Sequence, residues 1–264
     1  MNTATYAVRD SVTMLRRNLK HMARYPSQTL MLIGLPLLFL LLFVYVFGGT
    51  MGAGLPGAPA GDRGDYLTFI TPGILVMAVA SVSISTAVSV ATDMTGGIID
   101  RFRTMAIAKV SVLTGHVLGA MVQTALALAT VFGVAFLLGL QTDASAMQWL
   151  DLIALLALLS FAMTWFTVAL GLASPNPEAA SNWPMIFIML PFVGSGFVPV
   201  ESMPTGLRWF AENQPFTPII DAYRGLLVGS PDGSDVLWAI GWCVVIGLVG
   251  YLWSRRLYRT RAAN

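Results

Sequence analysis

The sequence has few charged residues and almost no cysteine. Asp, Glu, Lys and Arg make up 11% of its 264 residues, whereas 56% are hydrophobic, and soluble domains carry about 25% charged residues. This composition excludes a soluble globular domain and predicts an integral membrane protein. The single cysteine, Cys243, excludes an internal disulfide and a zinc site built from several cysteines. Its place in an apolar stretch indicates a small buried side chain.

Motifs for catalysis and energy coupling are missing as well. The chain has no HExxH zinc motif, no GxSxG elbow and no GxxxxGK[ST] phosphate loop, so we expect no enzyme activity, no metal and no cofactor in this chain. Its apolar stretches hold almost no ionisable residue, although ion-coupled transporters place such groups near the midplane. Asp93 and Asp151 lie at stretch ends, and His116 has no acidic partner in its own segment. For His116 this favours packing or interfacial hydrogen bonding over a functional role.

What the sequence does contain is six apolar stretches. The first, residues 29–47, has no charge, and 19 helical residues at 1.5 Å per residue cover a hydrocarbon core of about 30 Å. The fifth carries Pro184 and Pro191, which predicts a short, broken helix. We therefore predict an all-α protein with six transmembrane helices, over about residues 29–47, 67–92, 110–140, 152–173, 183–200 and 236–253.

The distribution of Lys and Arg predicts the orientation, because basic residues near span ends stay in the cytoplasm. Twelve of the fifteen precede the first span, lie between the second and third, or follow the sixth. These segments share one side only if the number of spans is even. Both termini are therefore expected in the cytoplasm, with residues 254–264 as a basic tail. The twelve are Arg9, Arg16, Arg17, Lys20, Arg24, Arg101, Arg103, Lys109, Arg255, Arg256, Arg259 and Arg261.

Residues 1–28 are expected to form a basic amphipathic helix at the inner membrane surface. Apolar residues recur there every three or four positions, and Arg and Lys occupy another side. Such a helix places its apolar face in the acyl boundary and its cations among anionic lipid headgroups. It serves either as a topology anchor or as a docking element. The candidate interface residues are Leu15, Arg16, Leu19 and Lys20.

Two short helices are predicted between spans five and six. Thr217 before Pro218 resembles an N-cap, and Gly229 resembles a C-cap, which predicts a helix over residues 218–228. A second helix is expected over residues 205–212. Neither is long enough to span the bilayer, so both are expected to be re-entrant or interfacial.

Two further features each have two interpretations. Ala78, Ser81, Ser85 and Ser89 form a stripe of small residues along the second span, which indicates either close helix packing or the lining of a translocation path. The connection over residues 91–109 is either a solvated connector or a docking surface. Spans with few fixed charges suit an amphiphilic or lipophilic cargo better than an ion.

Two segments resemble the permease subunits of type-2 ABC exporters, in particular the daunorubicin-resistance-type drug efflux permeases. GGIIDRFRTM at Gly96–Met105, followed by Gly115, resembles the coupling segment of that family. GFVPVESMP together with NQPFTPIIDAYRGLL resembles its outer segment between the last two spans. With the basic N-terminal helix and the six spans, the resemblance covers essentially the whole chain.

The resemblance implies the type-2 ABC exporter fold in the plasma membrane, with export of a drug, antibiotic or lipid. It also implies two ABC ATP-binding subunits that hold the ATP and Mg, and a second permease subunit, expected to be another copy. Membrane lipids and a hydrophobic substrate are the other expected partners, and nucleic acid is not one. The residues implied to meet the ATPase are Gly97, Ile98, Asp100, Arg101, Phe102 and Arg103. Those implied to border the cargo path are Ser81, Ser85, Ser89, Phe187 and Phe192.

Three alternatives stay open at this point. An exporter of polysaccharide or lipid-linked glycan would line its channel with aromatic residues, for which Trp165, Trp183, Phe187 and Phe192 are available. An ion-gradient transporter is disfavoured by the missing midplane carboxylates. A membrane scaffold without transport activity is the most distant of the three.

Overall fold

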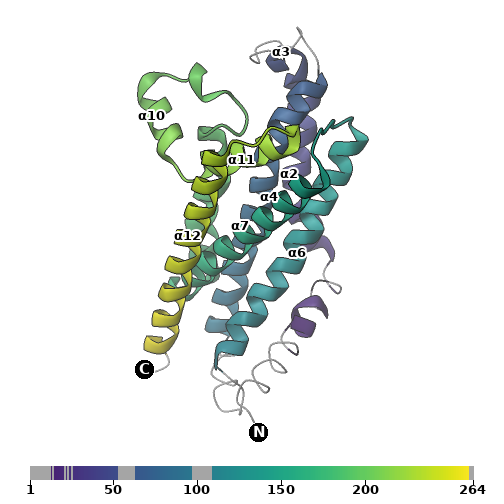
Figure 1. The fold of residues 1–264 in the computed structure, drawn as a ribbon. Coiled ribbons are helices and arrows are strands. Elements are labelled where there is room, and N and C mark those ends of the chain that lie inside the picture. The colour runs from purple at the N-terminus through teal and green to yellow at the C-terminus, as the bar shows by residue number, and fades with distance from the viewer. Residues whose placement is uncertain are drawn as a thin grey trace.

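The structure is a computed structural model, and it describes residues 13, 15–20, 22, 24, 26–52, 63–96 and 109–261. Within these ranges every regular element is helical, and the long helices stand side by side in one bundle (Figure 1). Five helices are long and apolar enough to cross a membrane. They lie at Thr29–Thr50, within the unbroken run of α2 (Pro26–Leu42), η1 (Phe43–Phe47) and α3 (Gly48–Gly52), and in α4 (Arg63–Thr95), α6 (Lys109–Leu137), α7 (Ala146–Ala173) and α12 (Gly233–Arg261).

Helix α4 is the centre of the bundle. Every residue from 70 to 83 is buried, because α2, α6, α7 and α11 (Phe216–Val228) surround it. A helix that is apolar all round needs such cover. Gly171 of α7 lies against the backbone of Ala87, so these two helices approach more closely than larger side chains would allow.

The expected third span, residues 110–140, ends earlier than predicted. Helix α6 stops at Leu137, and a turn follows in which Gly139 has φ of 98°. This left-handed conformation suits glycine and ends a helix. The last three residues of the predicted span therefore belong to the connection to α7.

The expected fifth span, residues 183–200, is not one regular helix. A shorter irregular run occupies residues 177–193, and Gly194 after it is extended. Pro184 and Pro191 lie in its 3₁₀ turns, where each removes a backbone donor from the helix. This irregular run consists of α8 (Pro177–Asn182), η2 (Trp183–Met185), α9 (Ile186–Met189) and η3 (Leu190–Val193).

Helices α7 and α12 run in the same direction. Gly247 lies against Ala162, and three residues later Gly250 lies against the backbone of Phe166. Because the contact moves toward the C-terminus on both helices at once, the two helices are parallel. The chain between α7 and α12 therefore returns along the bundle, and the irregular run lies on this return path.

Short helices gather at one end of the bundle. They are η4 (Val200–Ser202), α10 (Thr205–Asn213) and α11, which crosses the direction of the long helices (Figure 1). The prediction that Thr217 caps α11 was wrong, because the helix begins at Phe216 and the Thr217 hydroxyl instead donates to the Ala211 carbonyl at 2.6 Å. Gly229 does end α11 in the left-handed conformation, with φ of 79°.

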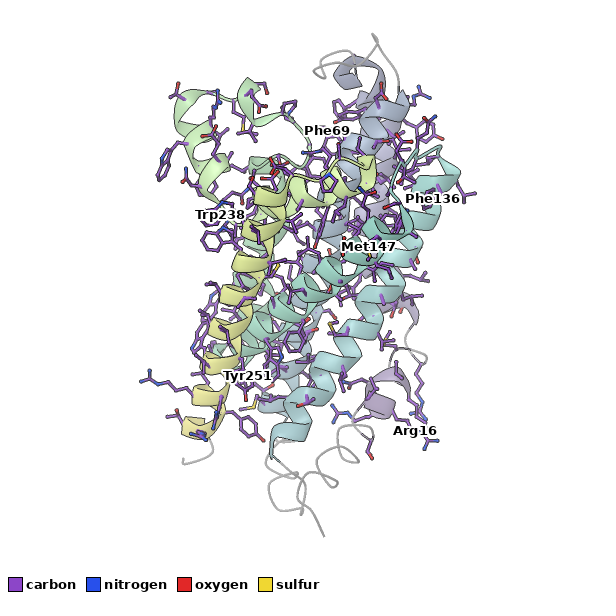
Figure 2. The ribbon with its side chains drawn as sticks, viewed as in Figure 1. Arg16, Phe69, Phe136, Met147, Trp238 and Tyr251 are labelled. Carbon is purple, nitrogen blue, oxygen red and sulfur yellow. The ribbon has the colours of Figure 1, made fainter. Side chains whose placement is uncertain are left out.

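The other end of the bundle is called the basic end here, because it carries Arg17, Arg255, Arg256 and Arg259. The N-terminal helix (described residues between 13 and 24), the last turn of α4, the first turns of α6 and the last turns of α12 meet there. Arg16 and Tyr251 lie toward this end, and Phe69 and Trp238 toward the opposite end (Figure 2).

Candidate functional site

Three ionisable side chains from three helices meet at the basic end. Arg17 Nη2 of the N-terminal helix donates to Asp93 Oδ2 at the end of α4, at 2.5 Å. His116 Nε2 of α6 lies 3.0 Å from the same oxygen, and because an ionised carboxylate only accepts, this nitrogen carries the proton. The side chains of His116 and Asp93 are 5% and 10% exposed, whereas Arg17 is 39% exposed. We call these three residues the ion triad.

A second contact holds the N-terminal helix against α6. Asn18 Nδ2 donates to the carbonyl oxygen of Gly115 at 3.0 Å. A Cβ at Gly119 would lie 2.9 Å from Asn18 Nδ2, so the glycine makes room for the asparagine. Asn18 and Arg17 thus tie one face of this helix to the beginning of α6 and the end of α4.

The predicted interface residues of this helix lie largely away from the bundle. Arg16, Leu19 and Lys20 are exposed, and Leu15 is half-buried. Because Arg17 and Asn18 hold the helix to the bundle, the exposed residues are left free for lipid or a partner. Arg16 accordingly lies at the edge of the bundle (Figure 2).

The ion triad also frames the predicted coupling segment. Asp93 lies three residues before Gly96, and His116 is the eighth residue of α6, the described helix that follows. Gly97, Ile98, Asp100, Arg101, Phe102 and Arg103 lie outside the described residues, so their role stays a prediction.

A cavity of about 840 Å³ adjoins the ion triad. The N-terminal helix, α2, α4 and α6 line it, with Arg17, Asp93 and His116 among the lining residues. Ser85 and Ser89 from the predicted small-residue stripe also line it. Ser81 does not, because it is buried and donates to the Met77 carbonyl at 2.9 Å. The stripe therefore serves packing at one end and lines a cavity at the other.

The predicted path residues Phe187 and Phe192 lie elsewhere, among other aromatic rings. Phe192 stacks on Phe197 with ring centroids 4.4 Å apart, and Phe197 stacks on Phe43 of η1 at 4.7 Å. The ring centroid of Phe187 lies 5.7 Å from that of Phe166 and 6.3 Å from that of Phe216. The structure thus does not bring them together with Ser85 and Ser89.

Arg224 of α11 holds the opposite end together. Its guanidinium donates to the Ser195 carbonyl, to the Phe69 carbonyl at 3.3 Å and to Asp221 Oδ1 at 2.5 Å. The same group lies over the Phe69 ring, 4.1 Å from its centroid. Arg224 therefore fastens α11 to α4 and to the loop after the irregular run, and we call these contacts the Arg224 clamp.

The same loop touches α4 backbone to backbone. A Cβ at Gly73 would lie 2.7 Å from the carbonyl oxygen of Gly196, so only glycine fits at this crossing. Nearby, Gln214 Nε2 donates to the Leu190 carbonyl and to Thr217 Oγ1, both at 3.1 Å. The irregular run and α11 are thus bound into one unit at the opposite end.

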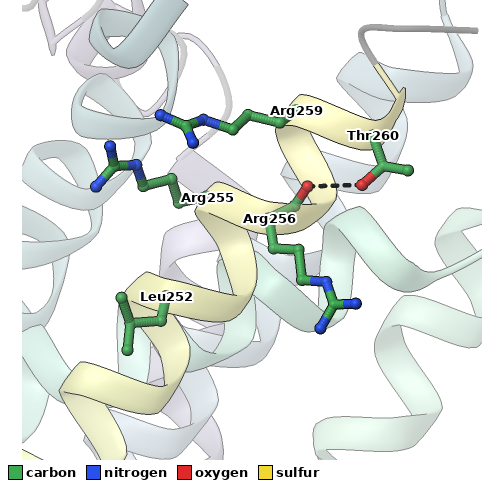
Figure 3. Close-up of a pocket in the computed structure, with 5 residues that line it drawn as sticks. All are labelled: Leu252, Arg255, Arg256, Arg259 and Thr260. Atoms are coloured by element: carbon green, nitrogen blue, oxygen red, sulfur yellow. Dashed lines mark hydrogen bonds between the residues drawn. The ribbon is translucent and has the colours of Figure 1, made fainter.

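The last turns of α12 carry a cluster of cations. Arg255 and Arg259 extend to one side of the helix and Arg256 to the other, around an open depression of about 430 Å³ (Figure 3). Above them, Tyr251 packs edge-on against Trp165 with centroids 5.0 Å apart. Aromatic rings one turn away from clustered arginines are typical of a membrane boundary.

The sequence did not reveal the ion triad. The sequence shows no acidic partner for His116 within its own segment, and the structure supplies Asp93 from the neighbouring helix. The available signal was positional. Asp93 and His116 lie in turns on either side of one connection, and helices joined by a connection place such turns side by side.

Comparison with known proteins gives one family and relatives that match nearly the whole chain. Residues 10–228 match the family described as ABC-2 type transporter. The daunorubicin resistance ABC transporter permease protein DrrB1 of Streptomyces coeruleorubidus is 32% identical over 261 residues, which is 98% of this chain and 89% of that protein. The probable doxorubicin resistance ABC transporter permease protein DrrC of Mycobacterium tuberculosis is 24% identical over 257 residues, or 95% and 91% of the two chains.

Proposed function

The chain belongs to the ABC-2 type transporter family, and from that premise we propose that it is the permease of an exporter for a hydrophobic or amphiphilic compound. The names of its relatives favour a drug or antibiotic. The five long apolar helices place it in a membrane as a multi-pass protein. The observation that carries the proposal is the ion triad, which joins the N-terminal helix to both sides of the predicted coupling segment.

In this proposal the basic end faces the cytoplasm of the cell that exports the compound, and the membrane is the plasma membrane. The clustered arginines of α12 and the N-terminal helix support this orientation, since such residues stay inside. The irregular run makes the sixth crossing, because the parallel α7 and α12 require a return path. Helices α10 and α11 are then re-entrant or interfacial on the outer side. Neighbouring helices cover α11, whereas α10 is exposed except at Ala211.

Energy comes from a separate ATP-binding subunit, which binds ATP and Mg and hydrolyses the ATP. Arg16, Leu19 and Lys20 on the exposed face of the N-terminal helix, together with residues 97–103, would meet that subunit. Movement of the N-terminal helix would then pull on α4 and α6 through Arg17 and Asn18. Two ATP-binding subunits and two permeases would form the complete exporter.

A second copy of the chain is the proposed permease partner. Trp183, Met185, Ile186 and Met189 of the irregular run are exposed apolar side chains along one short segment. Exposed apolar surface next to a broken helix suits contact with another subunit and the path between the two.

The packing of the aromatic residues supports an amphiphilic compound over a glycan. Phe187 and Phe192 contact other rings of the same chain, and Trp165 is buried. A glycan channel needs aromatic faces that are open to the sugar. Of these four aromatics, only Trp183 is exposed.

The test is reconstitution of the permease with the ATP-binding subunit that co-purifies with it, in liposomes loaded with ATP on the side of that subunit. We expect ATP-dependent transport of a hydrophobic dye that persists when an ionophore collapses the proton gradient. Transport that stops with the gradient, or a chain that binds no ATPase, would overturn the proposal. Asp100→Ala and Phe102→Ala should leave membrane insertion intact and separate ATP hydrolysis from transport.

A further inference from the structure

The cavity beside the ion triad differs from an ordinary packing defect in size and in lining. Its volume, about 840 Å³, falls within the range of cavities that hold drug-sized molecules. One part of the wall is apolar, with Met31 and Leu32 of α2 and Ile84 and Val88 of α4. Met31 is 82% exposed, so the cavity opens alongside α2.

Hydrogen-bonding groups on the wall have spare capacity. On α4, the hydroxyls of Ser83, Thr86 and Thr92 donate to carbonyls four residues earlier, at 2.8 to 3.1 Å. Ser85 and Ser89 line the cavity and, among the described residues, have no hydrogen-bond partner. The same holds for Gln123, a half-buried amide in the middle of α6. An amide without a partner in an apolar helix is costly, which points to a ligand group that pairs with it.

The unpaired groups lie deeper in the bundle than the ion triad. Gln123 follows His116 by seven residues on α6, and Ser85 precedes Asp93 by eight on α4. At 1.5 Å per residue these separations are about 10 to 12 Å along the helix axes. The cavity thus has a charged rim at the basic end and an uncharged, hydrogen-bonding interior.

The charges at the rim are paired with one another. Asp93 accepts from both Arg17 and His116, so it is not a free counter-ion for a cationic ligand. The interior selects by shape, apolar contact and hydrogen bonds to Ser85, Ser89 and Gln123. This chemistry suits an uncharged amphiphile with a rigid apolar body and a hydroxyl or carbonyl group.

We infer that this cavity is a binding site for the exported compound, an uncharged amphiphile whose polar group pairs with Gln123 and Ser85. The inference rests on the proposed export function and adds a residue, Gln123, from a helix that the sequence did not implicate. Arg17 and Asn18 of the N-terminal helix also line the cavity, so movement of this helix changes the shape of the site. ATP binding would thereby change the affinity for the compound.

The experiment is photolabelling of the purified permease–ATPase complex in nanodiscs with a diazirine-bearing hydroxysteroid, read out by mass spectrometry. Label is expected on residues 84–92 and 116–123, and excess unlabelled hydroxysteroid should displace it. Gln123→Leu should raise the hydroxysteroid concentration that gives half-maximal labelling about three- to tenfold, the range of one or two hydrogen bonds. Ser85→Phe should place a ring inside the cavity, where it competes with the ligand, and strongly reduce the label.

Two matched variants control for general effects. Gln141→Leu makes the same change in an exposed connection, and Ala129→Phe adds the same ring on an exposed face of α6. Both should label like the unaltered chain. Three results would overturn the inference. They are label spread uniformly over lipid-facing residues, no effect of Gln123→Leu and Ser85→Phe, and equal labelling by a diazirine phospholipid. Site-specific label without ATP-driven transport would contradict the proposed function alone.

Discussion

The two ends of the bundle are held together by different means. At the opposite end, α4 touches the loop at Gly196 backbone to backbone, aromatic rings stack at 4.4 and 4.7 Å, and the Arg224 clamp fastens α11. At the basic end, the N-terminal helix is held by Arg17 and Asn18 next to a large cavity. The difference teaches that the N-terminal helix at the basic end can shift at small cost, whereas the opposite end must move as one unit.

This difference matches what an ATP-driven permease needs. Densely packed regions move as one unit, whereas a segment held by few contacts shifts at lower cost. Under the proposed orientation, the movable N-terminal helix faces the ATPase and the rigid unit forms the outer part. Four variants probe the comparison.

The largest effect is expected from Gly73→Val at the opposite end. Its Cβ would lie 2.7 Å from the Gly196 carbonyl oxygen, so α4 and the loop must separate. We expect a loss of about 3 kcal/mol in the free energy of unfolding, as for strong overpacking. Thermal unfolding in detergent measures it. Gly133→Val is the matched control, because no atom lies within 4 Å of a Cβ there. Equal stability of the two variants would show that the crossing is not tightly packed.

Arg224→Gln tests the Arg224 clamp. It removes the donors to the Ser195 and Phe69 carbonyls and leaves these part-buried groups without their partner. We expect about 2 kcal/mol of destabilisation. Arg208→Gln is the comparison, because Arg208 pairs with Glu212 on the exposed surface of α10, where such a pair adds little stability. If Arg208→Gln destabilised the chain as much as Arg224→Gln, the clamp would have no special role.

Asn18→Ala tests the looser end and should have a small effect. It removes one hydrogen bond to the Gly115 carbonyl, worth about 1 kcal/mol. The free energy of unfolding of the whole chain should change little, while amide hydrogen exchange of the N-terminal helix should become faster. Asn213→Ala, which removes a comparable bond to Trp209 on α10, should leave this exchange unchanged. Unaltered exchange in Asn18→Ala would mean that other contacts hold the helix.

Much of the helical framework could be predicted from sequence. Long uncharged runs predict the five long helices, and Gly229 predicts the end of α11 because few other residues adopt its backbone conformation. Pro184 and Pro191 predict that the fifth stretch is broken, although not that the irregular run begins at Pro177 and ends at Val193. Thr217 was misjudged because a hydroxyl chooses its acceptor in three dimensions, and the Ala211 carbonyl lies closer.

The site was harder to predict than the fold. In the ion triad, Arg17 and His116 are 76 and 23 positions away from Asp93 in the sequence, and no local sequence pattern predicts contacts over such separations. Ser85 and Ser89 were predicted as a stripe with two interpretations, and only the cavity distinguishes them from Ser81. The predicted contacts of residues 97–103 with an ATPase stay a prediction.

The central claim is that the ion triad carries the movement of the N-terminal helix into the bundle. Asp93→Asn tests it directly, through the number of molecules transported per ATP hydrolysed by the reconstituted complex. The account predicts that this ratio falls while ATP hydrolysis continues, that Asp93→Glu restores part of it, and that Asp151→Asn, an exposed carboxylate on α7, leaves it unchanged. An unchanged ratio in Asp93→Asn would contradict the account.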